Sequence, residues 1–364
     1  MSDQLDWVDI GARLRQSRIA AGLSQDQLAR AIGLERTMVA KAEAGVRRLD
    51  ALELSRVAAV LGLPMAHFLA RPPAVLSRRT ELAEDANADA ARNAYLLEAE
   101  LASWLRDVRQ LIGLGVLDHA RPVRYPGAIR DAADARDAAT WLRNELGAGN
   151  DPLGSLLQLC ETAGQLLLAA DVPGEGASAL DGDLAVCVVS SRSEPGRRRS
   201  TAAHELGHLV IGDEYSTDLA VHSSREDRER AVDAFAAELL LPSAAVSHAV
   251  AASSLEGTRT ALVRLAAVYR TSWSLVLRQA ERAGVIDQRQ SLASRVPTRA
   301  ELMDAAGWVP EPDLEQLRVP PSVAAAVMKA WRRGLITPAR AEELSRGQIS
   351  ADDLAFASDV GEKP

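Results

Sequence analysis

The sequence predicts a mainly α-helical protein with a small β-sheet, an α+β fold. Alanine is abundant and aromatic residues make up 4% of the chain, a composition that favours helices. In most segments the apolar residues recur at helical spacing. Two apolar runs rich in strand-forming residues, 165–170 and 184–190, are expected to form the sheet, and the Gly- and Asp-rich segment 173–183 separates them.

The 364 residues are enough for two or three domains. We expect a helical domain over 8–70 and a linker with a long amphipathic helix over 71–130. A domain that contains the small sheet should cover 131–250, and a helical region should follow over 251–364. The sequence assigns no role to residues 290–364.

Composition and charge restrict the function. The formal net charge is −8, so any DNA contact has to come from a local basic patch. The two cysteines, Cys160 and Cys187, have no metal-type spacing, which suits a reducing cytosol. No segment is apolar for long enough to span a bilayer, and the N-terminus has no signal-peptide core. We therefore expect a cytoplasmic protein with no membrane partner.

The first seventy residues contain the signals of short helices joined by tight turns. A helix over 9–21 is followed by a second helix, which begins at a capping box formed by Ser24 and Gln27. Gly33 ends that helix, and a third covers 36–44. Two short helices joined by a glycine-containing turn form a helix-turn-helix unit, whose second helix enters the major groove of DNA. Two more helices should pack behind this unit, at 49–61 and 65–69.

Several positions in this stretch match the pattern of one known family: 11–15, 22–25, 28–29, 33–34, Glu43, Gly45 and 58–62. At these positions, residues 8–70 resemble the Xre/Cro-type helix-turn-helix family. The resemblance implies a five-helix domain that binds a double-stranded DNA operator. By position, it places Arg36, Thr37 and Lys41 at base edges. It places the following residues at phosphates: Arg18, Ser24, Gln25 and Arg48.

Other features of this region bear on DNA binding. The family typically pairs Glu43 with the arginine of the first helix, here Arg18, and that pairing competes with a phosphate contact. Glu35 departs from the family pattern, which often has Ser or Thr there, and its carboxylate would repel a nearby phosphate. Residues 10–70 contain nine basic and five acidic side chains, an excess that favours DNA. Docking to another protein is the alternative role of such a domain.

The linker contains apolar residues at helical spacing from 81 to 111. Two roles are compatible with one long amphipathic helix there. It is either a spacer packed on the following domain or a dimer helix, and a homodimer would suit two-fold DNA half-sites.

The sequence His204-Glu205-Leu206-Gly207-His208 is an H-E-x-x-H motif. Two histidines four apart on a helix project from the same face, so both can reach one metal ion. The adjacent glutamate is then placed to handle the proton of an attacking water. The alternative is an ordinary polar face of a helix. The basic run 197–199 just before the motif is expected to be a solvated loop.

A catalytic zinc takes three protein ligands, so a third is required. Glu214 and Glu229 are the candidates. Glu214 lies six residues after His208, where metzincins place their third ligand. Metzincins, however, need a glycine three residues after the second histidine to turn the chain, and here that position is Ile211, with Gly212 one residue later. Glu229 lies in a predicted helix over 225–241, and Asp233 follows it by one turn, where it could brace a ligand histidine. This E-x-x-x-D placement is the gluzincin arrangement, and Glu229 is preferred.

The run 201–209, followed by Glu229 and then by 235–242, resembles the ImmA/IrrE family of zinc metallopeptidases, over about residues 131–245. The resemblance implies a gluzincin-like core in which His204, His208 and Glu229 hold Zn²⁺ and Glu205 is the general base. Characterised relatives cut a helix-turn-helix repressor. Two residues depart from the family pattern: Ser200 replaces an aromatic residue and Asp233 replaces Asn.

Peptide hydrolysis also needs a donor to the oxyanion, and the candidates are Tyr215, His222 and His248.

From the two resemblances together, we expect a DNA-binding transcriptional regulator with a zinc-dependent endopeptidase domain that cleaves a regulatory, repressor-type protein. The alternative is a non-proteolytic transcription factor that uses the peptidase-like domain as a sensor or dimerisation module.

Overall fold

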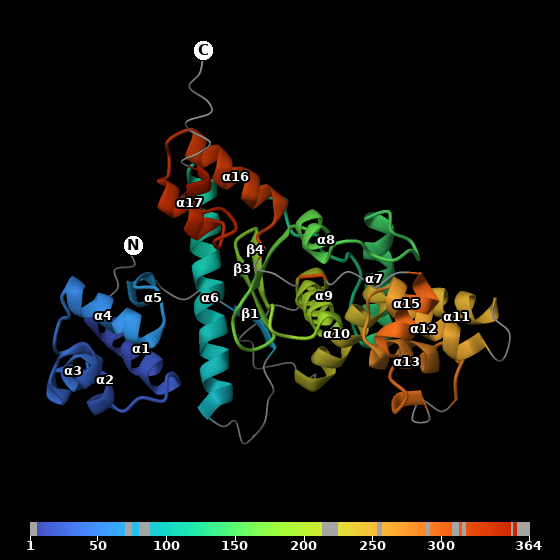
Figure 1. The fold of residues 1–364 in the computed structure, drawn as a ribbon, viewed down its shortest axis with the longest axis horizontal. Coiled ribbons are helices and arrows are strands. Elements are labelled where there is room, and N and C mark those ends of the chain that lie inside the picture. The colour runs from blue at the N-terminus through green and yellow to red at the C-terminus, as the bar shows by residue number, and fades with distance from the viewer. Residues whose placement is uncertain are drawn as a thin grey trace, which may run out of the picture.

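The computed structural model confirms a mainly α-helical protein with a small sheet (Figure 1). The residues that the structure describes are 6–69, 75–79, 88–212, 225–252, 257–287, 292–307, 313–314, 318–350 and 352–354. The N-terminal helices are α1 (Trp7–Ala20), α2 (Gln25–Ile32), α3 (Arg36–Glu43), α4 (Ala51–Leu61) and α5 (Ala66–Leu69).

The N-terminal helices follow from their capping residues. Ser24 and Gln27 form the predicted capping box of α2, and Gly33 ends that helix in the left-handed conformation, with φ of 72°. Apolar side chains from all five helices form one buried core; they include Leu14, Leu28, Val39, Val57 and Phe68. The predicted pair of Arg18 and Glu43 is present and buried, and it ties α1 to α3.

Gly11→Ala is expected to destabilise this helical domain by about 1–3 kcal/mol, because α1 and α3 touch at Gly11. A Cβ added there would lie 2.8 Å from the carbonyl oxygen of Glu43 and closer still to that of Ala42. Urea unfolding followed by circular dichroism measures the effect. Gly113→Ala is the control, since no neighbouring atom lies within 4 Å of a Cβ added there. An equal loss in both variants would contradict the steric explanation.

The long linker helix, α6 (Ala88–Gly113), is buried along one face against the sheet of the same chain. The buried side chains are Leu97, Leu101, Trp104, Leu105, Val108 and Leu111. Trp104 Nε1 also donates to the carbonyl oxygen of Leu166, at 2.9 Å. The apolar face of α6, which the sequence allows as a spacer face or as a dimer face, is therefore buried against the sheet of the same chain.

The same helix also contacts the N-terminal domain through a polar cluster. The hydroxyl of Tyr95 on α6 lies within hydrogen-bonding distance of Ser17 Oγ and of His67 Nε2. Burial lowers the pKa of His67 to about 4, so its ring is neutral at neutral pH. The linker helix thus packs on the sheet and, through this cluster, on α1 and α5.

The sheet has four strands in the order β1-β3-β4-β2: β1 (Val75–Arg79), β2 (Gln165–Ala170), β3 (Gly176–Asp181) and β4 (Leu184–Ser190). Strands β2 and β4 are parallel, whereas β3 is antiparallel to both β4 and β1. The sequence predicts β2 and β4 but not the other two strands. Strand β3 lies inside the segment that separates the two predicted runs, and its small residues carry little strand propensity. Strand β1 lies in the predicted linker.

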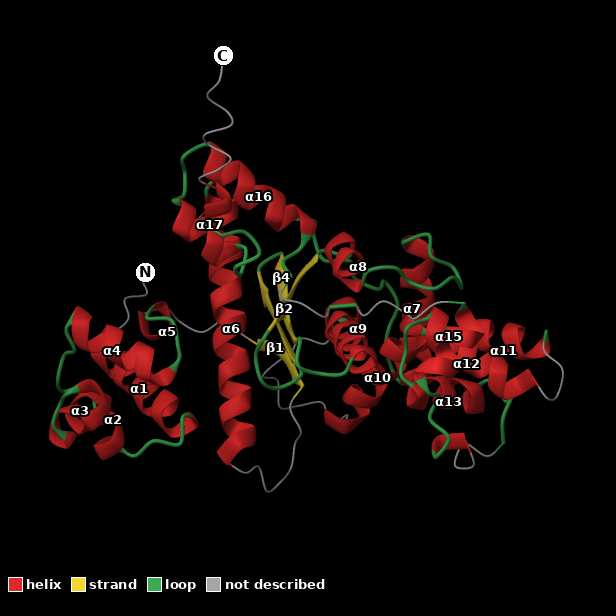
Figure 2. Cartoon of the chain, in the orientation of Figure 1, coloured by secondary structure: helices red, strands yellow, loops and turns green. Residues whose placement is uncertain are grey.

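The sheet is covered on both faces (Figure 2). Helix α6 packs against β3 and β4 on one face, and α9 (Pro195–Ile211) packs on the other. Helices α7 (Ala132–Glu145), α8 (Leu156–Thr162) and α10 (Arg225–Leu240) also contact α9, so α9 lies between the sheet and other helices. Because α9 is enclosed, its histidines are fixed on a rigid element.

The remaining helices form two groups (Figure 1). The first group contacts the helices around α9 and consists of α11 (Ser243–Ala251), α12 (Thr258–Val268), α13 (Trp273–Arg282) and α15 (Arg299–Ala306). The second consists of α16 (Pro321–Arg332) and α17 (Pro338–Leu344), and Arg340 of α17 bonds to Asp107 of α6. Within the described part of the chain, no single helix passes the length and hydropathy test for a membrane span, although the bent pair Glu226–Leu240 and Ser243–Ala251 passes it together.

Candidate metal centre

Helix α9 starts before the arginine run, which corrects the expectation of a solvated loop. Pro195 occupies the first turn of the helix, where its missing N–H costs nothing. Arg198 and Arg199 are 4% and 1% exposed. Arg198 donates to the carbonyl oxygens of Ser191 and Ser193, and Arg199 forms a buried ion pair with Asp313. The signal that was available in the sequence was Pro195 itself, a typical first residue of a helix.

The ligand atoms of three predicted residues lie together, all within 4.8 Å of one another: those of His204, His208 and Glu229. His204 Nε2 is 3.1 Å from His208 Nε2 and 3.2 Å from Glu229 Oε2. His208 Nε2 is 3.9 Å from the same carboxylate oxygen. Four tetrahedral ligands at about 2.0–2.1 Å from Zn²⁺ lie about 3.3 Å apart, so the three atoms have the separations that a small divalent ion requires.

Asp233 orients the first histidine. Its Oδ1 lies 2.9 Å from His204 Nδ1, on the side of the ring opposite the cluster. A carboxylate that accepts this N–H leaves the other ring nitrogen free of a proton and able to bind a metal. Both histidines are buried, whereas the Glu229 side chain is 31% exposed, so the cluster opens towards α10.

Glu205 is completely buried beside the cluster, on the same helix. Its Oε2 accepts a hydrogen bond of 2.7 Å from Ser178 Oγ on β3. Its Oε1 has no hydrogen-bond partner among the described residues. One carboxylate oxygen is therefore held by the sheet while the other is available. Ser178 was not predicted, because no local pattern links a serine on a strand to a helix 27 residues later.

The predicted DNA-contacting residues differ in what they do in the structure. Arg36, Thr37, Lys41 and Arg48 are exposed, on α3 and the turn after it. The Ser24 hydroxyl caps α2, and Gln25 Nε2 donates to Glu43 Oε2 at 2.8 Å. The exposed groups all lie on or just after the second helix of the helix-turn-helix unit; Ser24 and Gln25 also bond within the domain.

Comparison with known proteins gives two family matches. Residues 14–68 match the helix-turn-helix family, and residues 160–281 match the peptidase family described as IrrE N-terminal-like domain. The chain joins a helix-turn-helix domain to an IrrE-like peptidase domain. Both family resemblances seen in the sequence are thereby confirmed. The IrrE-like match extends through α12 and most of α13.

No curated protein matches the chain. Among solved structures, it is similar to Bacillus thuringiensis PlcR in complex with the peptide PapR7 and DNA. The identity is 12% over 98% of this chain and 100% of PlcR, and the TM-score is 0.19. A TM-score this low does not indicate a shared fold or function.

Of the four other candidate residues for the IrrE-like site, the structure describes only His248. Tyr215, His222 and the alternative ligand Glu214 lie outside the described residues. His248 is exposed on α11 and lines a cavity with residues of α12, and the residues that line this cavity include none of the cluster. An oxyanion donor is therefore not identified among the described residues.

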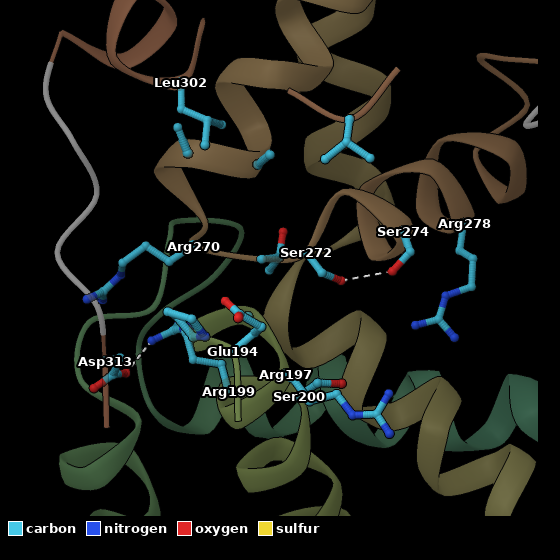
Figure 3. Close-up of a pocket in the computed structure, with 16 residues that line it drawn as sticks. Glu194, Arg197, Arg199, Ser200, Arg270, Ser272, Ser274, Arg278, Leu302 and Asp313 are labelled. Carbon is cyan, nitrogen blue, oxygen red and sulfur yellow. Dashed lines mark hydrogen bonds and ion pairs between the residues drawn. The ribbon is translucent and has the colours of Figure 1, made fainter. Parts of the chain in front are cut away.

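A larger cavity of about 680 Å³ lies at the N-terminal end of α9 in the IrrE-like domain (Figure 3). The first turns of α9 and the turn between α12 and α13 line it, and Arg199 and Asp313 form their ion pair at its edge. Arg270 adopts a left-handed φ of 52° in that turn and donates to the carbonyl oxygen of Leu153 at 2.9 Å. The residues that line this cavity do not include the metal cluster, so it is separate from the candidate centre.

Proposed function

We propose that the protein is a DNA-binding transcriptional regulator whose IrrE-like domain is a zinc-dependent endopeptidase of the gluzincin type. Its substrate is a regulatory, repressor-type protein. The observation that carries the proposal is the cluster of His204, His208 and Glu229 beside the buried Glu205. The fusion to a helix-turn-helix domain supports a regulatory substrate, since the domain would bring the peptidase to the operator where a repressor sits.

The donor set fits zinc. Two imidazole nitrogens and one carboxylate oxygen are a common ligand set of catalytic zinc, and the spacing of the three atoms suits it. His204, His208 and Glu229 would hold the ion, with Asp233 fixing the His204 ring. When bound, the zinc ion would polarise the scissile carbonyl and lower the pKa of water.

The chain's own residues would manage the protons. Glu205, through its unpartnered Oε1, would accept a proton from the attacking water and donate it to the nitrogen of the leaving amine. Water supplies the hydroxyl that joins the carbonyl carbon, and the C–N bond breaks. The hydrogen bond from Ser178 would keep Glu205 pointed at the site, so Ser178 is a positioning residue.

Metal content tests the ligand assignment. His208→Ala is expected to lose zinc, because two ligands bind the ion much more weakly than three. Wild type should contain one zinc per chain when measured by inductively coupled plasma mass spectrometry. The control is His248→Ala, a histidine exposed on α11, which should keep the metal. Full zinc occupancy in His208→Ala would refute the ligand set.

We further propose that α3 reads an operator in double-stranded DNA. Replacing Arg36 and Lys41 together with alanine should abolish specific operator binding and leave the zinc content unchanged, because both side chains are exposed on α3. Fluorescence anisotropy with a genomic operator fragment measures this. Arg30→Ala, at an exposed arginine of α2, is the control. Unaltered affinity in the double variant would remove the recognition-helix assignment.

A further inference from the structure

Strand β1 is paired with β3, the strand whose Ser178 hydrogen-bonds to the Glu205 carboxylate. It runs antiparallel to β3, with Ser77 opposite Ser178, Arg78 opposite Ala177 and Arg79 opposite Gly176. Strand β1 comes from the segment between the helix-turn-helix domain and α6, more than eighty residues before the peptidase match begins. A piece of the connection between the two domains thus forms the edge of the peptidase sheet.

Strand β3 is in direct contact with the metal-binding helix. Ser178 Oγ donates to Glu205 Oε2, and Gly176 packs so closely that an added Cβ would lie 2.5 Å from Thr201 Cγ2 and 3.4 Å from Glu205 Cγ. Strand β1 itself also contacts α9. A chain paired with β3 therefore runs beside the candidate general base.

An extended peptide is held most simply by adding a strand to a sheet edge, because its main-chain groups then bond whatever its sequence. In the described sheet, β4 covers one edge of β3 and β1 covers the other. We propose that the β3 edge is the peptide-binding strand of this site and that β1 is its resident occupant. A protein substrate would enter as an extended segment and displace β1.

The pairing of β1 has the features of a displaceable strand. The strand is five residues long, and its register with β3 shifts between Val75 and Ser77. Short, irregular edge strands are held by few ladder hydrogen bonds. Because β1 is covalently attached, its effective concentration at the edge is on the order of millimolar, so it competes with any substrate that arrives from solution. This inference rests on the proposed function, whose site it regulates.

Proline substitutions on β1 test the inference. In an antiparallel pair, alternate residues direct their N–H groups at the partner, so one of Ser77→Pro and Arg78→Pro removes a hydrogen bond to β3. The probe is a fluorescein-labelled peptide with the sequence of residues 73–81. The full-length chain is used, with Glu205→Gln in every sample so that nothing is cleaved. Ser77→Ala and Arg78→Ala, which keep the N–H, are the matched controls.

The more disruptive proline variant is expected to bind the peptide at least tenfold more tightly than its alanine control. Amide hydrogen exchange at residues 177–179 should be faster in that variant and slow again when the peptide is added. In zinc-loaded chains with Glu205 restored, the same proline variant should hydrolyse unfolded casein at least tenfold faster than its alanine control. Faster exchange without peptide binding would overturn the inference, because β1 would then be an ordinary structural strand. Peptide binding without casein hydrolysis in any variant would support the peptide edge and count against the proposed peptidase.

Discussion

Glu205→Gln is expected to lower kcat for peptide hydrolysis by about 10²–10⁴-fold, the contribution of a general base, and to leave the zinc content unchanged. The amide cannot accept the proton of water, yet it has the size of the carboxylate and can still accept the hydrogen bond from Ser178. Cleavage of unfolded casein and of repressors encoded by neighbouring genes measures the rate, and mass spectrometry measures the metal.

The control for this experiment is Glu226→Gln, an exposed carboxylate on α10 that should cleave like wild type. Equal rates for Glu205→Gln and wild type would exclude Glu205 as the base. Zinc in wild type with no cleavage of any substrate would instead favour a sensor-type regulator that binds metal and cuts nothing.

The largest effect on stability is expected at Asp313. Asp313→Ala should cost about 3–5 kcal/mol of unfolding free energy, because it leaves Arg199 as an unpaired charge in the interior. Burial already lowers the pKa of Arg199 to about 10. Asp313 also accepts a hydrogen bond of 3.0 Å from the backbone N–H of Leu156, so a second buried donor would lose its partner. Urea unfolding measures the loss.

Two further variants show whether burial of the charge is the cause. Asp171→Ala removes the exposed ion pair with Arg192 and should have a much smaller effect. Combining Asp313→Leu with Arg199→Met should recover much of the stability, since an apolar pair of similar volume needs no partner. A double variant no more stable than Asp313→Ala would show that the loss comes from packing or from the Leu156 N–H, which neither variant satisfies, and not from the charge.

Local patterns predicted the N-terminal helices, the long linker helix, the capping box at Ser24 and the helical placement of His204 and His208. Each of these depends on residues a few positions apart, where spacing alone determines which side chains share a face. Glu229 and Asp233 were placed by their distance from the motif and by family resemblance, and the structure brings both to His204. Their roles as ligand and positioning residue stay predictions.

Features formed by distant segments were missed. Strand β3 forms because β4 and β1 flank it, not because its own residues favour a strand, and β1 comes from a different part of the chain. Ser178 reaches the Glu205 carboxylate only because β3 forms. The arginines before the motif looked solvated because their partners, the carbonyl oxygens of the preceding turn and Asp313, cannot be recognised from the run itself.

The pair of Arg199 and Asp313 also bears on how the protein is made. Asp313 follows Arg199 by 114 residues, and Ala169 of β2 likewise forms a backbone bridge with Arg318. During translation, all the residues of the metal cluster emerge well before Asp313 is synthesised. Until then Arg199, at the start of the second turn of α9, has no counter-charge. We therefore expect α9 to reach its final stability only late in synthesis, and a chain terminated before residue 313 would contain all three candidate metal ligands while α9 lacks this buried ion pair.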